Sequence, residues 1–235
     1  MSIRTLNLIL LFNIMASFTG WSQTEDDSTD NKIDLDFRMD IVSRYIWRGQ
    51  EYGHAPSIQP EITASWKGFT LGAWGAYKLN GEGIQETDIY LSKTIGPVTF
   101  AVWDYWTFDD TALMDFMDFK EETTAHVLEA QALIEGGETL PFNFLASYLF
   151  YGSDTTKSLY FELQYVTRFK EIDFMAFAGY SPKGKYYGSR EGLVNIGLTL
   201  SREVQVTETW GFPLSMSLIY NPDVKSMYLV AAISF

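Results

Sequence analysis

The 235-residue sequence contains no cysteine. It therefore has no disulfide framework, no thiolate metal site, no cysteine nucleophile and no cysteine that could carry a lipid anchor. Basic residues are scarce too: 17 Lys and Arg stand against 30 Asp and Glu, which gives a net charge of −13. Because binding to nucleic acid requires clustered positive charge that replaces the counterions of the phosphates, we expect no nucleic-acid partner.

Long hydrophobic runs are also lacking. Beyond the N-terminal segment there is no run of about 18 apolar residues, which argues against a bundle of transmembrane helices. No glycine-rich phosphate loop or dinucleotide fingerprint occurs, and we expect no cofactor and no metal. Aromatic residues, in contrast, make up 16 % of the chain, so it is rich in the residues that bury apolar area and is not a disordered acidic polymer.

The N-terminus has the order of a secretory signal peptide. Arg4 precedes an apolar stretch over 6–18, which is too short to cross roughly 30 Å of hydrocarbon as a helix, and small and polar residues follow. We predict a signal peptide over 1–22 and a polar leader over 23–32. The alternative is a buried N-terminal helix.

From Ile33 onward the hydrophobic pattern has a period of two, which is typical of strands with one apolar and one polar face. Leu35, Phe37 and Met39 share one face of the first segment, for example, and charged residues share the other. Twelve such segments are predicted, over residues 33–48, 58–67, 69–79, 84–95, 97–108, 123–135, 140–151, 157–170, 171–181, 190–202, 209–220 and 226–235.

The lengths of these segments suit strands that cross a bilayer at a tilt. Short connections such as Lys67-Gly68 alternate with longer ones such as 109–122 and 182–190. Both features favour an all-β fold, a closed antiparallel transmembrane barrel of 12 strands with short periplasmic turns and longer extracellular loops. The competing fold is a soluble sandwich or lipocalin-like barrel, in which the apolar face points inward. The segment 97–108 can be oriented either way.

Aromatic side chains near the segment ends suit the two girdles that such barrels place at the membrane interfaces. They are Tyr45, Trp47, Trp66, Tyr77, Tyr148 and Tyr220. In the last segment the residues Met227, Leu229, Ala231, Ile233 and Phe235 share one face. This alternation with a final aromatic is similar to the C-terminal signal that the barrel-assembly machinery reads in outer-membrane proteins.

Four stretches resemble the TorF family of porins. They are Asp40 to Gly49 (DIVSRYIWRG), Pro56 to Pro60 (PSIQP), Trp66 to Trp74 (WKGFTLGAW) and Glu86 to Tyr90 (ETDIY). The resemblance covers about the first third of the chain in detail and the remainder only as barrel pattern. It implies a small integral barrel of the outer membrane in a Gram-negative envelope, with a pore function, and it implies no substrate or catalytic residue.

If the apolar face meets lipid, the charged residues of the other face line the lumen. These candidate pore-lining residues are Asp36, Arg38, Asp40, Arg44, Arg48, Glu61, Lys78, Glu86, Asp88, Glu129, Glu162 and Arg168. They could line a water-filled pathway, or they could form ion pairs that seal a narrow barrel. Arg38, Arg44 and Arg48 could form an anion ladder on one strand, and neighbouring carboxylates could equally neutralise it.

The function expected from this pattern is passive diffusion of small polar solutes or ions across the outer membrane, with lipid and the barrel-assembly machinery as further partners. One alternative is a sealed barrel that binds a partner, for which the loop 182–188 is the best contact. Another is an outer-membrane hydrolase, but His54 and His126 are the only histidines, and we expect no catalytic residue. An acidic loop around Asp115 could hold Ca²⁺, yet it lacks the spacing of an EF-hand.

Overall fold

The computed structural model describes residues 32–80 and 83–235. The predicted signal peptide and all of the predicted leader except Lys32 lie outside the described residues. Within the described part of the chain, no helix is long and apolar enough to cross a bilayer. The strands are β1 (Asp34–Val42), β2 (Tyr45–Trp47), β3 (Gln50–Tyr52), β4 (Ser57–Trp66), β5 (Phe69–Lys78), β6 (Ile84–Ile95), β7 (Val98–Asp109), β8 (His126–Ile134), β9 (Phe142–Gly152), β10 (Leu159–Phe169), β11 (Ile172–Lys183), β12 (Gly192–Gln205), β13 (Gly211–Asn221) and β14 (Ser226–Ser234).

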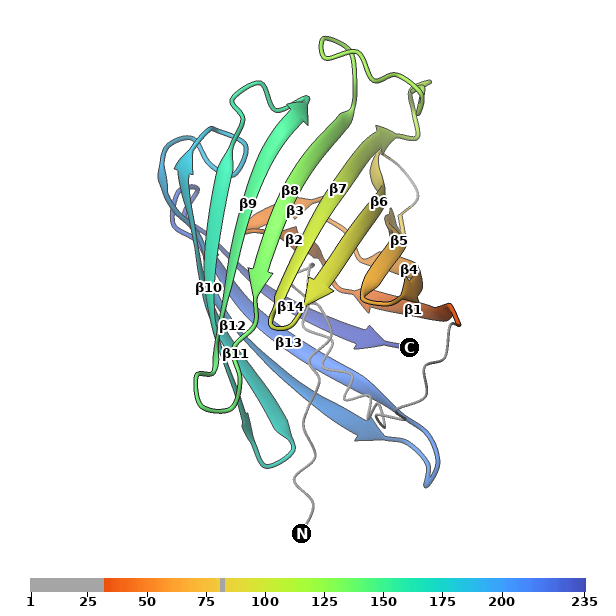
Figure 1. Cartoon of the computed structure of the whole chain (residues 1–235), viewed down its shortest axis with the longest axis vertical. Helices are drawn as coiled ribbons and strands as arrows, with labels where there is room; N and C mark the ends of the chain where they lie inside the picture. The colour runs from red at the N-terminus through yellow and green to blue at the C-terminus, as the bar shows by residue number, and fades with distance from the viewer. Residues whose placement is uncertain (1–31, 81–82) are drawn as a thin grey trace.

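Twelve of these strands close into one antiparallel barrel (Figure 1). The strand order around it is β1, then β14 down to β4, so sequence neighbours pair along the wall and β1 closes the circle against β14. The predicted closed 12-stranded barrel is confirmed. Closure leaves every barrel strand with a partner on each side, which removes the open edges of a flat sheet.

Tight turns join several strands at one end of the barrel. Lys67 and Gly68 have φ angles of 49° and 76°, and Lys170 has 56°. These left-handed conformations are those of two-residue hairpin turns, whose twist matches that of the flanking strands. The longer connections, including 110–125 and 184–191, lie at the opposite end (Figure 1).

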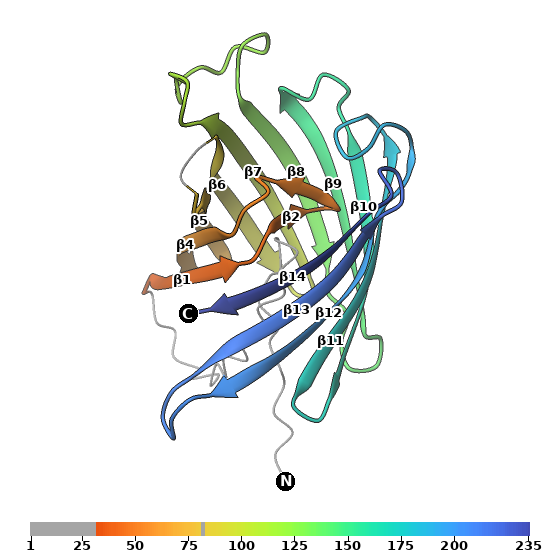
Figure 2. The same ribbon diagram turned by 180° about the vertical axis from the view of Figure 1, so that it is seen from behind.

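The first predicted segment, 33–48, is wrong at its C-terminal end. β1 ends at Val42, and β2 then pairs with β3 in a separate two-stranded sheet. Arg48 and Gly49 cause the reversal, because their φ angles of 48° and 80° form a hairpin turn in the middle of the predicted strand. We call the segment 43–56 the inner hairpin. Both views show β2 and β3 inside the barrel outline (Figures 1 and 2).

The barrel wall has an apolar outside. Leu71, Leu91 and Leu163 are at least half exposed, whereas residues of the opposite parity, such as Tyr90 and Gln164, are buried. This arrangement is the reverse of a soluble barrel, in which the apolar parity points inward. The predicted face parity is therefore observed in the structure.

Strand β7, which the sequence could not orient, follows the same rule. Phe100 and Val102 point outward, and Trp103 and Tyr105 are buried inside. Four of the six predicted girdle residues, Trp66, Tyr77, Tyr148 and Tyr220, are exposed on the outside. The prediction is wrong for Tyr45 and Trp47, because both belong to the inner hairpin and are buried.

The seam between β1 and β14 is short. Only Asp40 to Val42 pair in register with Ala232 to Ser234, and backbone hydrogen bonds from Met39 and Ser43 extend the contact at its two ends. By comparison, all nine residues of β1 pair with β4. The seam is limited at both ends, because Asp34 to Arg38 extend past the end of β14, and because the chain turns into the lumen after Ser43 instead of continuing beside β14.

Candidate functional site

The inner hairpin packs against opposite parts of the barrel wall. Tyr45 contacts Trp74 of β5 with ring centroids 5.5 Å apart, and Trp47 contacts Tyr105 of β7 at 5.4 Å. Ile46 belongs to a second apolar cluster, whose other buried members are Val42, Met175, Phe177, Ile219, Val230 and Ala232. Because these members come from β1, β11, β13 and β14, the hairpin reaches across the lumen.

An ion pair fixes the tip of the hairpin to the far wall. Arg48 binds Glu129 of β8 in a bidentate manner, with Nη1–Oε1 at 2.5 Å and Nη2–Oε2 at 3.1 Å. Both side chains are almost fully buried. Bidentate pairing of a guanidinium with a carboxylate adds geometric specificity to the attraction, so it defines one position for the tip.

Aromatic residues surround this ion pair. The Tyr105 hydroxyl donates to Glu129 at 2.7 Å, and the Tyr187 hydroxyl lies 2.5 Å from Arg48 Nη1 and donates to Glu129 at 2.9 Å. The guanidinium carbon also lies 4.5 Å from the ring centroids of both Trp47 and Tyr160. Such cation–π contacts strengthen in a dry environment. The residues around Arg48 thus compensate for the removal of its charge from water.

Hydrogen bonds from side chains to backbone carbonyls hold the hairpin turn as well. The side-chain amide of Asn221 donates to the carbonyl of Gly49 at 3.0 Å, and the side-chain amide of Gln50 donates to the carbonyl of Tyr186 at 2.5 Å. A Cβ atom at Gly49 would lie 2.2 Å from the carbonyl oxygen of Val194. Glycine is required at this position by both its φ angle and this close approach.

A second buried carboxylate lies on β10. Glu162 accepts hydrogen bonds from Tyr160, from Gln164 at 2.8 Å and from Asn195 at 2.9 Å. No ion pair joins it to a cation of the described chain, so neutral donors alone stabilise this carboxylate. The ring of Tyr160 occupies the space over Gly179, where a Cβ would lie 2.0 Å from its hydroxyl.

The structure distributes the predicted pore-lining residues over several local contacts. Arg38 binds Asp40 at 2.9 Å and lies 3.9 Å from Glu61, and Arg44 binds Glu51 of the same hairpin. Arg38, Arg44 and Arg48 therefore do not form the ladder considered above, because only Arg38 lies on a barrel strand. The remaining members are placed as follows: Asp36 exposed near the start of β1, Lys78 half-buried at the end of β5, Glu86 and Asp88 buried on β6, and Arg168 half-exposed on β10, 3.5 Å from Asp173.

A cavity of about 930 Å³ opens above the hairpin at the long-loop end. Gln50 and Tyr52 of the hairpin line it, together with Lys78, Lys185 and Tyr187. We call this cavity the vestibule. The predicted contact loop 182–188 contributes to it through Lys185, Tyr187 and Gly188, next to Asp223 of the following connection.

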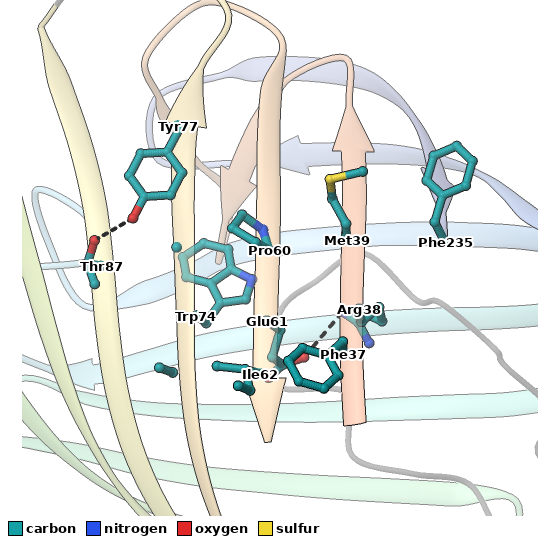
Figure 3. A pocket seen from close by; sticks show the side chains of 12 residues that line it. Phe37, Arg38, Met39, Pro60, Glu61, Ile62, Trp74, Tyr77, Thr87 and Phe235 are labelled. Atoms are coloured by element: carbon teal, nitrogen blue, oxygen red, sulfur yellow. Dashed lines mark hydrogen bonds and ion pairs between the residues drawn. The ribbon is translucent and has the colours of Figure 1, made fainter. Parts of the chain in front are cut away.

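A second concavity, of about 510 Å³, lies on the wall over β1, β4 and β5 (Figure 3). Pro60, Ala73 and Gly75 line it, and Figure 3 shows Tyr77 and Thr87 at one side and Phe235 at the other. Phe235, the last residue of the predicted assembly signal, also contributes. The other members of that signal, Met227, Leu229 and Ile233, lie on β14, where Met227 and Leu229 are exposed outward.

The two histidines named in the hydrolase alternative each contact a carboxylate. His126 is buried, with Nδ1 2.7 Å from Asp104 and Nε2 2.8 Å from the carbonyl oxygen of Phe116. Both ring nitrogens are thus occupied, and neither is available to take a proton from a nucleophile. His54 is exposed and bound to Glu51.

The acidic loop uses its carboxylates locally. Asp118 accepts from the Thr123 hydroxyl and from the amide of Lys120, and these bonds lower the pKa of Asp118. Among the described residues, no group of three His, Cys, Asp or Glu side chains is arranged to hold a metal ion.

No protein-family model and no curated protein sequence matches this chain. Among solved structures, a chain described as a KdgM porin is similar over 86 % of this chain and 97 % of its own length. The sequence identity is 10 % and the TM-score is 0.47. The resemblance to the TorF family stays a prediction.

Sequence reasoning missed the hairpin and most of the contacts inside the lumen. Tyr160 and Asn195 appear in no motif, and Tyr187 was noted only as part of the loop 182–188, because the roles of these residues depend on contacts between residues far apart in sequence. One local signal was available: an Arg-Gly pair between aromatic residues in a predicted strand suits a hairpin turn.

Proposed function

We propose that the protein is an integral outer-membrane barrel that admits small polar solutes or ions through a lumen narrowed by the inner hairpin. The observation that supports this most directly is the combination of an apolar outer wall with buried polar and charged side chains inside a closed barrel. A bilayer favours this arrangement, since the strands of a closed barrel pair their backbone groups with one another.

The location is part of the proposal. The predicted signal peptide, the alternating C-terminal strand and the resemblance to the TorF family support the outer membrane of a Gram-negative envelope. Lipid and the barrel-assembly machinery are then the partners of the outer wall and of β14. The proposal includes no catalytic step, and charged side chains rather than a cofactor would determine which solutes pass.

A second candidate is a sealed barrel with a structural or partner-binding role. The packing of the hairpin against opposite walls, and the buried pair of Arg48 and Glu129, favour this alternative. The two candidates differ in one property: a channel conducts alone in a bilayer, whereas a sealed barrel does not.

Single-channel conductance of the refolded mature chain in a planar bilayer separates them. The sharpest comparison is a variant in which Asn-Gly replaces residues 44–55. Val42 and Ser57 are register partners, so a short turn can join β1 to β4 directly. We expect ohmic steps from the wild type and larger steps from this variant.

The matched control shortens the outer loop 112–121, which is not part of the hairpin, and its steps should equal those of the wild type. Equal steps from the hairpin variant would show that the hairpin does not narrow the lumen. Silence of the folded, inserted wild type with conduction by the variant would identify a sealed barrel, and silence of both would reject the channel.

A further inference from the structure

The vestibule has an unusual charge distribution for a protein with a net charge of −13. Two carboxylates contribute to its lining, Glu51 and Asp223, and the side chains of both are more than nine-tenths covered. Two lysines, Lys78 and Lys185, line it as well, and no ion pair joins either of them to a carboxylate of the described chain. Among the lining side chains the accessible charge is therefore positive, and Asp109, which is not part of the lining, lies near enough to Lys78 to interact with it electrostatically.

The two lining carboxylates are fully engaged by groups around them. Glu51 binds Arg44 and lies 2.9 Å from Nδ1 of His54. Asp223 accepts from the amide and the hydroxyl of Ser189 at 2.6 and 2.9 Å, and Arg190 Nε lies 3.5 Å away. The bonds from Ser189 lower the pKa of Asp223, so it stays ionised and paired. Neither carboxylate is left to neutralise the lysines.

The positions of the lysines suit a ligand that lies across the hairpin. The aliphatic stem of Lys78 packs on Gly53, since a Cβ there would lie 2.5 Å from Lys78 Cδ. Lys185 comes from the loop on another side of the cavity, where its backbone amide is held by Thr156. The partly exposed ring of Tyr52 lies among the same lining residues, whereas the side chain of Tyr187 is fully buried. Two cations beside a partly exposed aromatic ring fit an organic anion.

We propose that the vestibule is a binding site for a small organic anion carrying carboxylate groups, held by Lys78 and Lys185. A cavity of about 930 Å³ lies within the range of small-molecule sites, roughly 300–1,000 Å³. The bound anion contacts both the hairpin and the loop 184–191, the two segments that Arg48 and Tyr187 connect. This inference names the class of solute that the proposed channel admits. Binding in the vestibule does not depend on the proposed function; only the passage of the anion through the lumen rests on it.

Citrate is a suitable probe, and sorbitol is its uncharged control. Binding to the folded, detergent-solubilised chain is measured by calorimetry at low ionic strength. We expect citrate to bind, sorbitol not to bind, and the affinity for citrate to fall as salt screens the charges. The double variant K78Q/K185Q should bind citrate at least about tenfold more weakly, because each lysine supplies a charge-assisted hydrogen bond.

Two further variants complete the test. K120Q removes a lysine from the outer loop 110–125, which does not line the vestibule, and should leave citrate binding unchanged. K78R/K185R keeps both charges and should retain most of the affinity. The inference is overturned if the wild type does not bind citrate, or if K78Q/K185Q binds it as tightly as the wild type.

Conductance measured on the same preparations separates this inference from the proposed function. Ohmic steps from a barrel that does not bind citrate would overturn the proposed binding site and still support the channel. Citrate binding by a folded barrel that stays silent would support the site and reject the channel.

Discussion

At the scale of single residues, the buried ion pair of Arg48 and Glu129 stabilises the position of the hairpin tip inside the barrel. Replacing Glu129 by Gln leaves the Arg48 charge buried without its counter-charge. We expect the free energy of unfolding to fall by about 3–5 kcal/mol, since breaking one partner of a buried pair is costly. Urea titration of the barrel in lipid vesicles, followed by tryptophan fluorescence, measures this change.

The matched variant replaces both partners, as Arg48→Met with Glu129→Leu. It removes both charges and fills a similar volume, so most of the lost stability should return. If E129Q were as stable as the wild type, Arg48 would have access to water, and the hairpin tip could not be held in the way described.

Two neighbouring residues of β10 test which face meets lipid. Leu163 is half exposed on the wall, and Gln164 is buried beside Glu162. Leu163→Lys should lower the free energy of unfolding in lipid vesicles by about 2–4 kcal/mol, because it places a charge near the middle of the bilayer. Gln164→Lys should cost far less, since the lone carboxylate of Glu162 is within reach. Equal losses at both positions would contradict the assigned faces.

At the scale of elements, strand alternation predicted the barrel wall well and the hairpin badly. The period of two continues from β1 through Tyr45 and Trp47, so the pattern by itself extends β1 to 48. It fails there because alternation does not distinguish a face that meets lipid from one that packs inside the lumen. The turn at Arg48 and Gly49 depends on Glu129 and Asn221, which lie far away in the sequence.

The short seam between β1 and β14 is in part a second consequence of the hairpin, which ends the pairing after Ser43. Ile41 and Ile233 are register partners there, and the chain has no cysteine of its own. Ile41→Cys with Ile233→Cys should form a disulfide under mild oxidation, because directly opposed residues of an antiparallel pair have Cα atoms about 4.5–5.5 Å apart. Mass spectrometry of the oxidised barrel detects the bond.

The control pair is Ile41→Cys with Leu229→Cys, which are not partners and should remain as free thiols. Cross-linking of the control but not of the register pair would show a shifted seam. A register pair that oxidises only after unfolding would show that β1 and β14 do not meet.

At the scale of the whole molecule, alternation indicated which charged residues share the inner face but not how they are arranged, and the pore-lining role stays a prediction. Alternation alone indicated that Glu129 and Glu162 share the inner face, and both are buried inside the barrel. It could not show that Arg48 reaches Glu129 from the hairpin, or that Lys78 and Lys185 meet at one cavity. Both relations depend on closure of the barrel, which brings distant strands around one lumen.

The orientation in the membrane is the last property that the whole fold predicts. If the long loops face the medium, a single cysteine introduced at Asp115 should react with a membrane-impermeant maleimide on intact cells. A cysteine at Glu171, in a tight turn at the opposite end, should react only after the outer membrane is made permeable. Because the chain has no native cysteine, each label reports one position. Labelling of Glu171→Cys but not of Asp115→Cys on intact cells would require the reverse orientation, and the vestibule would then open toward the periplasm.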